Sequence, residues 1–288
     1  MLRTKLLPTF NAVATGQTAT VDLPLGIQYH AIWLEVGDNG GTTIASGNLL
    51  GDIRVKINGK VQRTHSAVEL NALNGVNGTA YLLKTSGTAG QAAYRSYLPI
   101  YFAEPWRKDV KDQQMPAWNV AGDGISSFQI EVDIKAGLTT PVISGFYEWA
   151  PATGSLGAIG KVIRQTVGAL GTVQDFNQLD RRDFLQGIHL FPTVEGTPKY
   201  VNKVKLTYNG AEQQDLITTL ENQAKLLGRA MNPDTSGTPR YDLVIDYDDP
   251  INGALPLNGL AEFTLHVEYN AAAAGNLVML IERAGPPE

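Results

Sequence analysis

The sequence predicts an all-β protein made of two tandem, eight-stranded jelly-roll β-sandwiches with a few short helices. First, residues 127–135 and 262–270 alternate apolar and polar side chains, which is typical of strands with one face in a core and one in water. Second, many short segments of this kind are separated by turns, and eight strands in about 140 residues fit a jelly roll. Third, Phe263 follows Phe128 by 135 positions, which indicates one fold written twice. We expect the two rolls to comprise residues 1–151 and 152–288.

The first half of the chain contains strand candidates separated by turn signals. Asn58-Gly59 predicts a tight hairpin turn, because both residues tolerate positive φ. Residues 65–73 predict a short helix, and 75–93, rich in Gly, Thr, Ala and Asn, predict a long surface loop. Residues 151–160 are expected to be a linker. The strand candidates are 18–23, 29–36, 52–59, 97–102, 127–135 and 141–150.

The second half repeats this order with shorter loops. Five segments of the second half correspond, in the same order, to segments of the first half. Ile188 and Leu190 correspond to Ile32 and Leu34, 203–210 to 52–59, 241–247 to 97–102, 262–270 to 127–135, and 277–284 to 143–150. Alternating strands can resemble one another by chance, but a common order of landmarks favours duplication. One segment is an exception: in residues 211–231, Leu216, Leu220, Ala224 and Leu227 have helical spacing and predict a helix.

Composition excludes several classes of protein. The net charge is −5, from 23 basic and 28 acidic residues, which disfavours a protein that coats nucleic acid directly. The chain has no cysteine, so it has neither disulfides nor thiolate metal ligands. Cysteine content therefore does not indicate whether the protein works in a reducing or an oxidising compartment. No apolar run approaches the roughly 18 residues of a membrane span, and the first residues lack the apolar region of a signal peptide. We therefore expect a soluble chain that is not exported by a signal peptide.

The four histidines predict no metal site. A jelly-roll metal centre of the cupin type needs a His-x-His pair with a nearby Glu, and no such pair is present. His30, His189 and His266 fall in or at the start of strand candidates and are expected at the surface or at an interface. His65 is instead the first residue of the short helix predicted over residues 65–73.

Asp242, Asp246, Asp248 and Asp249 crowd one short segment and allow two interpretations. Carboxylates at this density can hold calcium, with Asp246, Asp248 and Asp249 as the candidate ligands. Asp242 and Asp246 also alternate with Leu243 and Ile245, which is typical of the wet face of a strand, and Asp248-Asp249 before Pro250 suits a turn. The ordered ligand spacing of an EF-hand is absent, so no metal residue is assigned.

No sequence motif assigns catalysis or a cofactor. The chain has neither a Gly-x-Ser-x-Gly elbow nor a phosphate-binding loop. Arg181 and Arg182 lie beside two Asp residues in 179–184, which favours a local ion-pair cluster over an anion site. Asn77-Gly78-Thr79 matches a glycosylation sequon of a kind that arises by chance. The tryptophans are expected in the core or at subunit contacts, and they are Trp33, Trp106, Trp118 and Trp149.

Over its whole length the chain resembles the double jelly-roll major capsid proteins of tailless icosahedral bacteriophages with an internal membrane, nearest to the corticovirus-like members. The resemblance is carried by LLPTFNAVATGQTATVDLPLGIQYHAIWLEV, by DIRVKINGKVQRTHSAVELNAL, and by the matching places of FQIEVDIK and FTLHVEYN. No single motif identifies the family. The resemblance depends on the length of the chain, the order of its segments and the repetition of that order in the second half. Residues 75–93 and 231–240 depart from the family, so no loop function is carried over.

The resemblance implies a structural protein and not an enzyme. Three copies would form a homotrimer with a pseudo-hexagonal outline that meets neighbouring capsomers in the virion shell after assembly in the host cytoplasm. Penton proteins and minor capsid or membrane proteins are the further expected partners, and the genome would lie inside a membrane vesicle. The first ten residues, with Arg3 and Lys5, are expected to lie outside both sandwiches, as an arm that makes contacts beneath the shell.

Two rival functions remain open at this point. A tandem β-sandwich that binds carbohydrate would need a strip of clustered aromatic residues, and the sequence shows no such strip. A two-domain jelly-roll enzyme would need convergent acid, base or metal residues, which the sequence also lacks.

Overall fold

The computed structural model describes residues 2–41, 46–79, 83–84, 94–122, 124–169, 171–193, 201–236, 239–246, 253–270 and 275–288. The chain divides into two compact units. Unit 1 comprises Met1–Lys161 and Gly285–Glu288, and unit 2 comprises Val162–Ala284. No helix in the described part of the chain is long and apolar enough to cross a membrane.

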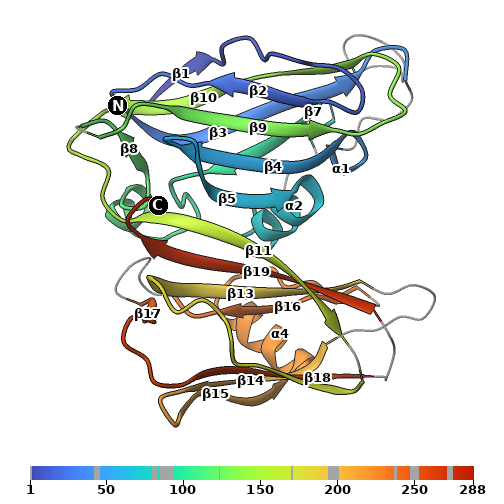
Figure 1. The fold of residues 1–288 in the computed structure, drawn as a ribbon, viewed down its shortest axis with the longest axis vertical. Helices are drawn as coiled ribbons and strands as arrows, with labels where there is room; N and C mark the ends of the chain where they lie inside the picture. Colours follow the sequence, from blue (N-terminus) through green and yellow to red (C-terminus); the bar gives the residue numbers. More distant parts are fainter. Residues whose placement is uncertain are drawn as a thin grey trace. The chain divides into compact units, whose positions relative to one another are not determined.

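Unit 1 contains two facing antiparallel layers of strands (Figure 1). The first layer has the order β2 (Thr18–Asp22), β9 (Phe128–Ile134), β4 (Leu50–Ile57) and β5 (Lys60–Ser66). The second has the order β1 (Arg3–Leu6), β10 (Pro141–Pro151), β3 (Ile27–Asp38), β7 (Ser96–Tyr101) and β6 (Leu83–Lys84), with β8 (Trp118–Val120) also paired to β3. The helices are α1 (Ser46–Leu49), α2 (Ala67–Val76) and α3 (Val110–Gln114).

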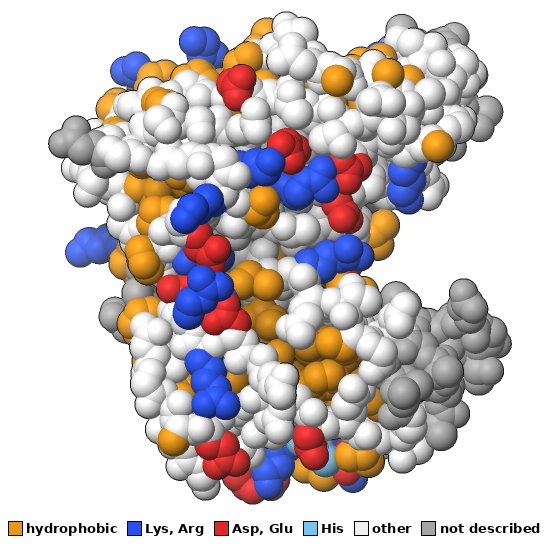
Figure 2. Space-filling view, in the orientation of Figure 1, with side chains coloured by type: hydrophobic (Ala, Val, Ile, Leu, Met, Phe, Trp, Pro, Cys, Tyr) orange, Lys and Arg blue, Asp and Glu red, His pale blue; other side chains and the backbone are white. Residues whose placement is uncertain are grey.

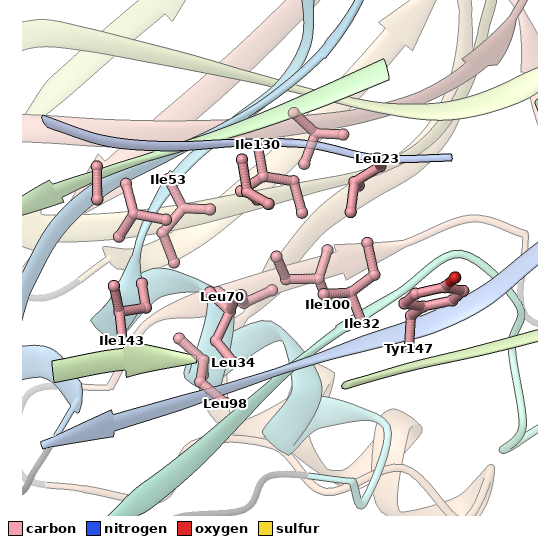
Figure 3. Packing of buried hydrophobic residues seen from close by; sticks show 14 of the residues in the cluster. Leu23, Ile32, Leu34, Ile53, Leu70, Leu98, Ile100, Ile130, Ile143 and Tyr147 are labelled. Atoms are coloured by element: carbon pink, nitrogen blue, oxygen red, sulfur yellow. The ribbon is translucent and has the colours of Figure 1, made fainter. Parts of the chain in front are cut away.

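The core of unit 1 fills the space between these layers. Phe128, Ile130, Val132 and Ile134 of β9 are buried, while the residues between them are partly exposed, as the alternation predicts. Figure 3 shows Ile53 and Ile130 of one layer facing Ile32 and Ile100 of the other, with Leu70 of α2 alongside. Burial of these alternating faces joins the two sheets into a sandwich.

Unit 2 is built from a second pair of layers. One has the order β12 (Val173–Phe176), β18 (Phe263–Tyr269), β14 (Val201–Tyr208) and β15 (Ala211–Thr218). The other has the order β11 (Ile159–Ala169), β19 (Gly275–Gly285), β13 (Phe184–Thr193) and β16 (Tyr241–Val244), with β17 (Leu255–Pro256) also paired to β13. Helix α4 (Thr219–Gly228) follows β15. A separate apolar cluster, which includes Ile188, Leu206 and Leu265, forms the core of this unit.

The two units share one strand order. β2-β9-β4-β5 corresponds to β12-β18-β14-β15, and β1-β10-β3-β7 corresponds to β11-β19-β13-β16. Both hairpins turn at Asn-Gly with positive φ at both residues: 52° and 76° at Asn58-Gly59, and 47° and 75° at Asn209-Gly210. This topology is what a duplicated fold requires.

The asparagine of each Asn-Gly turn also accepts hydrogen bonds from the backbone just before a neighbouring strand. The side-chain oxygen of Asn58 accepts hydrogen bonds from the backbone N–H groups of Ser126 (2.7 Å) and Ser127 (3.3 Å), just before β9. The side-chain oxygen of Asn209 accepts from Ala261 (2.9 Å) and Glu262 (3.2 Å), just before β18. Each hairpin therefore holds the start of the neighbouring strand in its layer.

The helix predicted over residues 211–231 is wrong in its first part. Residues Ala211–Thr218 form β15, and the helix begins only at Thr219. The tight turn at Asn209-Gly210 directs the following residues to pair with β14, and Thr218 then ends the strand as the N-cap of α4. The segment is no exception to the repeat, because α2 follows β5 in the same way. Both helices open with a capping box, Ser66 with Glu69 and Thr218 with Glu221.

The N-terminal segment is also placed differently from the prediction. β1 pairs with β10, so residues Arg3–Leu6 belong to a sheet of unit 1 and not to a free arm. All four residues of β1 are exposed, which explains why no burial pattern marked the strand in the sequence. An edge strand gains backbone hydrogen bonds from its neighbour without burying its side chains.

Other boundaries moved by a few residues. The helix expected over 65–73 is Ala67–Val76, because residues up to Ser66 pair with β4. The loop expected over 75–93 is interrupted by β6, and much of it lies outside the described residues. The linker expected over 151–160 begins inside β10 and ends inside β11.

We predict that substitutions of Asn58 separate the two roles of this turn residue. Asn58→Asp keeps the acceptor oxygen but loses the Nδ2–H that donates to the backbone carbonyl of Gly124 at 2.5 Å, so it should cost some stability but less than Asn58→Ala. Asn58→Gly removes the acceptor but fits positive φ, and Asn58→Ala also adds backbone strain, so its cost should be the largest, at about 1–3 kcal/mol. Urea unfolding of the variants measures this order. Equal losses in all of them would show that the side-chain hydrogen bonds contribute nothing.

Candidate functional site

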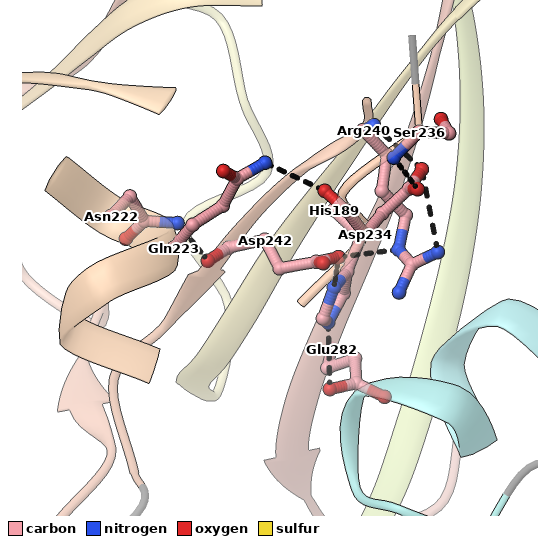
Figure 4. Close-up of polar contacts among 8 residues, drawn as sticks. All are labelled: His189, Asn222, Gln223, Asp234, Ser236, Arg240, Asp242 and Glu282. Atoms are coloured by element: carbon pink, nitrogen blue, oxygen red, sulfur yellow. Dashed lines mark hydrogen bonds and ion pairs between the residues drawn. The ribbon is translucent and has the colours of Figure 1, made fainter. Parts of the chain in front are cut away.

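The most concentrated polar cluster among the described residues lies in unit 2, on neighbouring strands. His189 comes from β13, Asp242 from β16 and Glu282 from β19, and β13 pairs with both of the other strands. Nδ1 of His189 lies 2.8 Å from Oδ1 of Asp242, and Nε2 lies 3.1 Å from Oε2 of Glu282. The imidazole therefore links two carboxylates across three strands (Figure 4).

Residues before β16 and on α4 complete the cluster. Nε of Arg240 donates to Oδ1 of Asp242 at 2.9 Å, and the Arg240 guanidinium lies 5.9 Å from the ring centre of Phe191. The backbone N–H of Arg240 donates to the carboxylate of Asp234 at 3.1 Å. Nδ2 of Asn222, on α4, donates to the backbone carbonyl of Asp242 at 2.9 Å. The cluster thereby ties the helix to the sheet.

The electrostatics favour a charged imidazole. Burial alone lowers the pKa of His189, but the carboxylates of Glu282 and Asp242 outweigh it and raise the pKa to about 9. When protonated, both ring nitrogens donate to carboxylates, so neither nitrogen offers a lone pair to a metal ion. The described residues hold no group of His, Asp and Glu side chains arranged to bind a metal. The arrangement is that of a structural ion cluster.

Three expectations about these residues were wrong. His189 and His30 were expected at the surface or an interface, and Asp242 on a wet strand face, but all of them are buried. Ile188 and Leu190 face the core of unit 2, so His189 points to the opposite side of the sheet. That side is also covered, and the local alternation of the sequence cannot reveal burial on both faces. His266, on β18, fits the expectation of a surface residue, because it is partly exposed beside Asp175 of the neighbouring strand β12.

The aspartates of the crowded segment do not share one environment. Asp242 belongs to the cluster above. Asp246 is buried and accepts a hydrogen bond from Nε2 of Gln186 at 3.1 Å. Asp248 and Asp249 lie outside the described residues, so the structure tests neither the calcium interpretation nor the turn interpretation of this segment.

The ion-pair cluster predicted within residues 179–184 is confirmed for Arg182, which lies 2.7 Å from Asp180. The structure adds a partner that the sequence did not indicate, because the buried Arg283 of β19 also reaches Asp180, at 3.1 Å. The hydrogen bonds from Arg182, together with Arg283, hold the pKa of Asp180 well below its usual range. Arg181 instead donates to the backbone carbonyls of Leu260 and Ala261.

Aromatic residues cluster in unit 1, although the sequence showed no aromatic strip. Trp118 is a core residue, as expected, and packs against Phe102 and Phe128. Trp33 and Phe146 stack at 5.8 Å between ring centres on β3 and β10. Tyr97 and Tyr101 of β7 adjoin this pair. Strand pairing brings together rings that lie far apart in the sequence.

Charged side chains on the other layer of unit 1 pair with one another. Arg54 and Lys56 of β4 contact Glu131 and Asp133 of β9 at 2.5–3.1 Å. Figure 2 shows Lys or Arg side chains beside Asp or Glu side chains over these strands. Opposite charges alternate across this face, so it presents no basic surface for nucleic acid.

Solved structures of viral capsid proteins share the fold of this chain. The major capsid protein P2 from Bacteriophage PM2 is similar at a TM-score of 0.80 and 17% identity, over 100% of this chain and 98% of that chain. A chain of Sulfolobus Turreted Icosahedral Virus matches at 0.69 and 12%, over 99% and 91%. The capsid of the virus PBCV-1 matches at 0.64 and 11%, over 99% and 93%. The shared fold is that of double jelly-roll capsid proteins.

The family follows from the sequence itself. Residues 4–150 match the viral coat protein P2 N-terminal domain, and they make up just over half of the chain. The chain belongs to this family of viral coat proteins. No curated protein sequence matches the chain. The predicted fold class, the predicted capsid-protein family and the place in the virion shell are thereby confirmed.

We predict that His189 makes stability depend on pH in the alkaline range. Its pKa is raised, so its stabilisation is complete below the unfolded value near 6.5 and is lost as the pH rises through about 9. Between pH 7 and pH 10 this loss should amount to about 2–3 kcal/mol in the free energy of unfolding. Urea unfolding at a series of pH values should show the decline in the original protein and not in His189→Gln.

The matched control is His266→Gln, which removes a partly exposed histidine and should keep the decline. A decline of the same size in His189→Gln would assign the pH dependence to other groups.

Proposed function

We propose that this chain is the major capsid protein of a tailless bacteriophage with an internal membrane, and that it works as a homotrimer. The observation that carries the proposal is the shared strand order of the two units. Three copies of such a chain present six similar rolls, and six similar rolls around one axis approximate a hexagon. A hexagonal outline can tile a shell with neighbouring copies of the same capsomer.

The proposed domain division is one roll over residues 1–151 and a second over 152–288. The net charge of −5 supports a shell protein that does not contact the genome directly, because nucleic acid is also negatively charged. Penton proteins, minor capsid or membrane proteins and the internal membrane are the further proposed partners. Assembly would take place in the host cytoplasm. The exposed strand β1 supports a contact of the N-terminal residues with such a neighbour.

The proposed role is structural and not enzymatic. The buried cluster of His189, Asp242 and Glu282 has its side chains bonded to one another, so it supports a role in stability. The aromatic group around Trp33 and Phe146 favours the rival carbohydrate-binding function in one respect, since sugars stack on aromatic rings. The apolar residues beside this aromatic group favour a contact with another protein chain.

We predict that the recombinant protein is a trimer in solution. Light scattering should give three times the chain mass of 31.0 kDa, and the value should hold on dilution because obligate contacts bury upward of about 2,000 Å². A well-folded monomer would contradict the proposal and favour the carbohydrate-binding alternative, which glycan-array binding of the same sample would then test.

A further inference from the structure

Helix α4 exposes three of its four apolar side chains and buries two polar ones. Leu220 is 75% exposed, Leu227 is 58% exposed and Ala224 between them is also exposed. The buried residues of the helix are Thr219, Asn222 and Leu226. An amphipathic helix of a globular domain normally turns its apolar stripe to the core. We call Leu220, Ala224 and Leu227 the helix stripe; the spacing that predicted a helix in the sequence marks its outer face.

The corresponding helix of unit 1 has the opposite character. In α2 the apolar residues Ala67, Leu70, Leu73 and Val76 are all buried, and Val68 is the large apolar residue left exposed. The two helices follow equivalent strands and share the same capping box. The helix stripe is therefore specific to unit 2, and an exposed apolar stripe of this kind marks a surface that another molecule covers.

Unit 1 carries a second apolar surface, on one of its sheets. The strand register pairs Leu6 of β1 with Phe146 of β10, Phe146 with Trp33 of β3, and Trp33 with Pro99 of β7. Directly paired residues of antiparallel strands point to the same side, so these side chains form one row across four strands. Ile32 and Tyr147, next to the row, belong to the core cluster, so the row lies on the outer side. We call these four residues the apolar row.

The apolar row is open to a partner at three of its four residues. Leu6 is 76% exposed, Trp33 and Phe146 are partly exposed, and Pro99, at the β7 end of the row, is buried. The side chains of Leu6 and Phe146 have no hydrogen-bonding group. Ser144 and Tyr97, which lie beside them, both hydrogen-bond to Glu35, whereas a sugar site needs polar groups that are available to fix the hydroxyls of its ligand. This chemistry favours leucine side chains over a carbohydrate as the occupant.

We propose that the helix stripe of one copy docks on the apolar row of the next copy around the three-fold axis. The inference rests on the proposed homotrimer and names its contact surfaces. The stripe lies on unit 2 and the row on unit 1, so each copy would offer two different surfaces, as a head-to-tail contact repeated around a three-fold axis requires. In a closed ring each copy contributes one stripe and one row, and no stripe or row stays uncovered.

The absence of cysteine from the chain permits a direct test. A variant with both Leu6→Cys and Leu227→Cys carries one thiol in the row and one in the stripe. Treatment of the trimer with a short bis-maleimide should produce covalent dimers and trimers on a denaturing gel. Each single variant should give none, because a heterologous contact brings together two different positions. The control combines Leu6→Cys with Val173→Cys. Val173 is an exposed residue of β12, outside the helix stripe, and should not cross-link.

Removal of the stripe gives a second readout. Leu220→Ser with Leu227→Ser should weaken trimerisation at least tenfold on dilution, while circular dichroism stays that of the original protein, because both residues are exposed in the folded chain. Val173→Ser is the matched control and should leave the trimer unchanged.

The outcomes separate this inference from the proposed function. A trimer by light scattering that gives no covalent oligomers, or that survives loss of the helix stripe unchanged, overturns the contact and leaves the homotrimer standing. Cross-linking of the Val173 control to the same extent also overturns it. A monomeric original protein overturns both.

Discussion

The fold depends on one constraint: each strand must pair its backbone along its edges while one of its faces is kept from water. The alternating strands β9 and β18 meet it by pairing with β4 and β14 and turning Phe128 and Phe263 into their cores. Two sheets facing one another are the smallest arrangement that buries such faces. The Asn-Gly hairpins set the register of the strands, and their asparagine side chains hold the next strand in place. A slip of one residue in the register would turn every apolar side chain of a strand to the wrong side.

The two units share a topology but differ in the chemistry of their outer surfaces. On the strands β3 and β10, Trp33 and Phe146 form an aromatic outer face. On the corresponding strands β13 and β19, His189 and Glu282 belong to a buried ion cluster. A similar division separates the helices, since α2 buries Leu70, Leu73 and Val76, whereas α4 exposes Leu220 and Leu227. The two units therefore share the arrangement of their cores, but their outer faces differ.

This difference has a physical consequence for assembly. A chain of two identical rolls would present the same surfaces twice and could join its copies in more than one way. Rolls with unlike flanks limit the productive contacts, because an apolar stripe gains little against a charged or hydrogen-bonded face. For a member of a viral coat protein family, such selectivity would favour closed rings over open chains.

The sequence by itself determined the alternating strands such as β9 and β18, the Asn-Gly turns, the common order of landmarks in the two halves, and the family. These features depend on neighbours along the chain, namely alternation at period two and turn residues that accept positive φ. Only the tertiary structure decided that β1 joins a sheet, that residues Ala211–Thr218 form a strand, that His189 and Asp242 are buried, and that Arg283 reaches Asp180. In each of these cases the deciding partner comes from another strand or lies far away in the sequence. A local pattern shows that a residue faces away from one core, but only the folded chain shows what covers the other side.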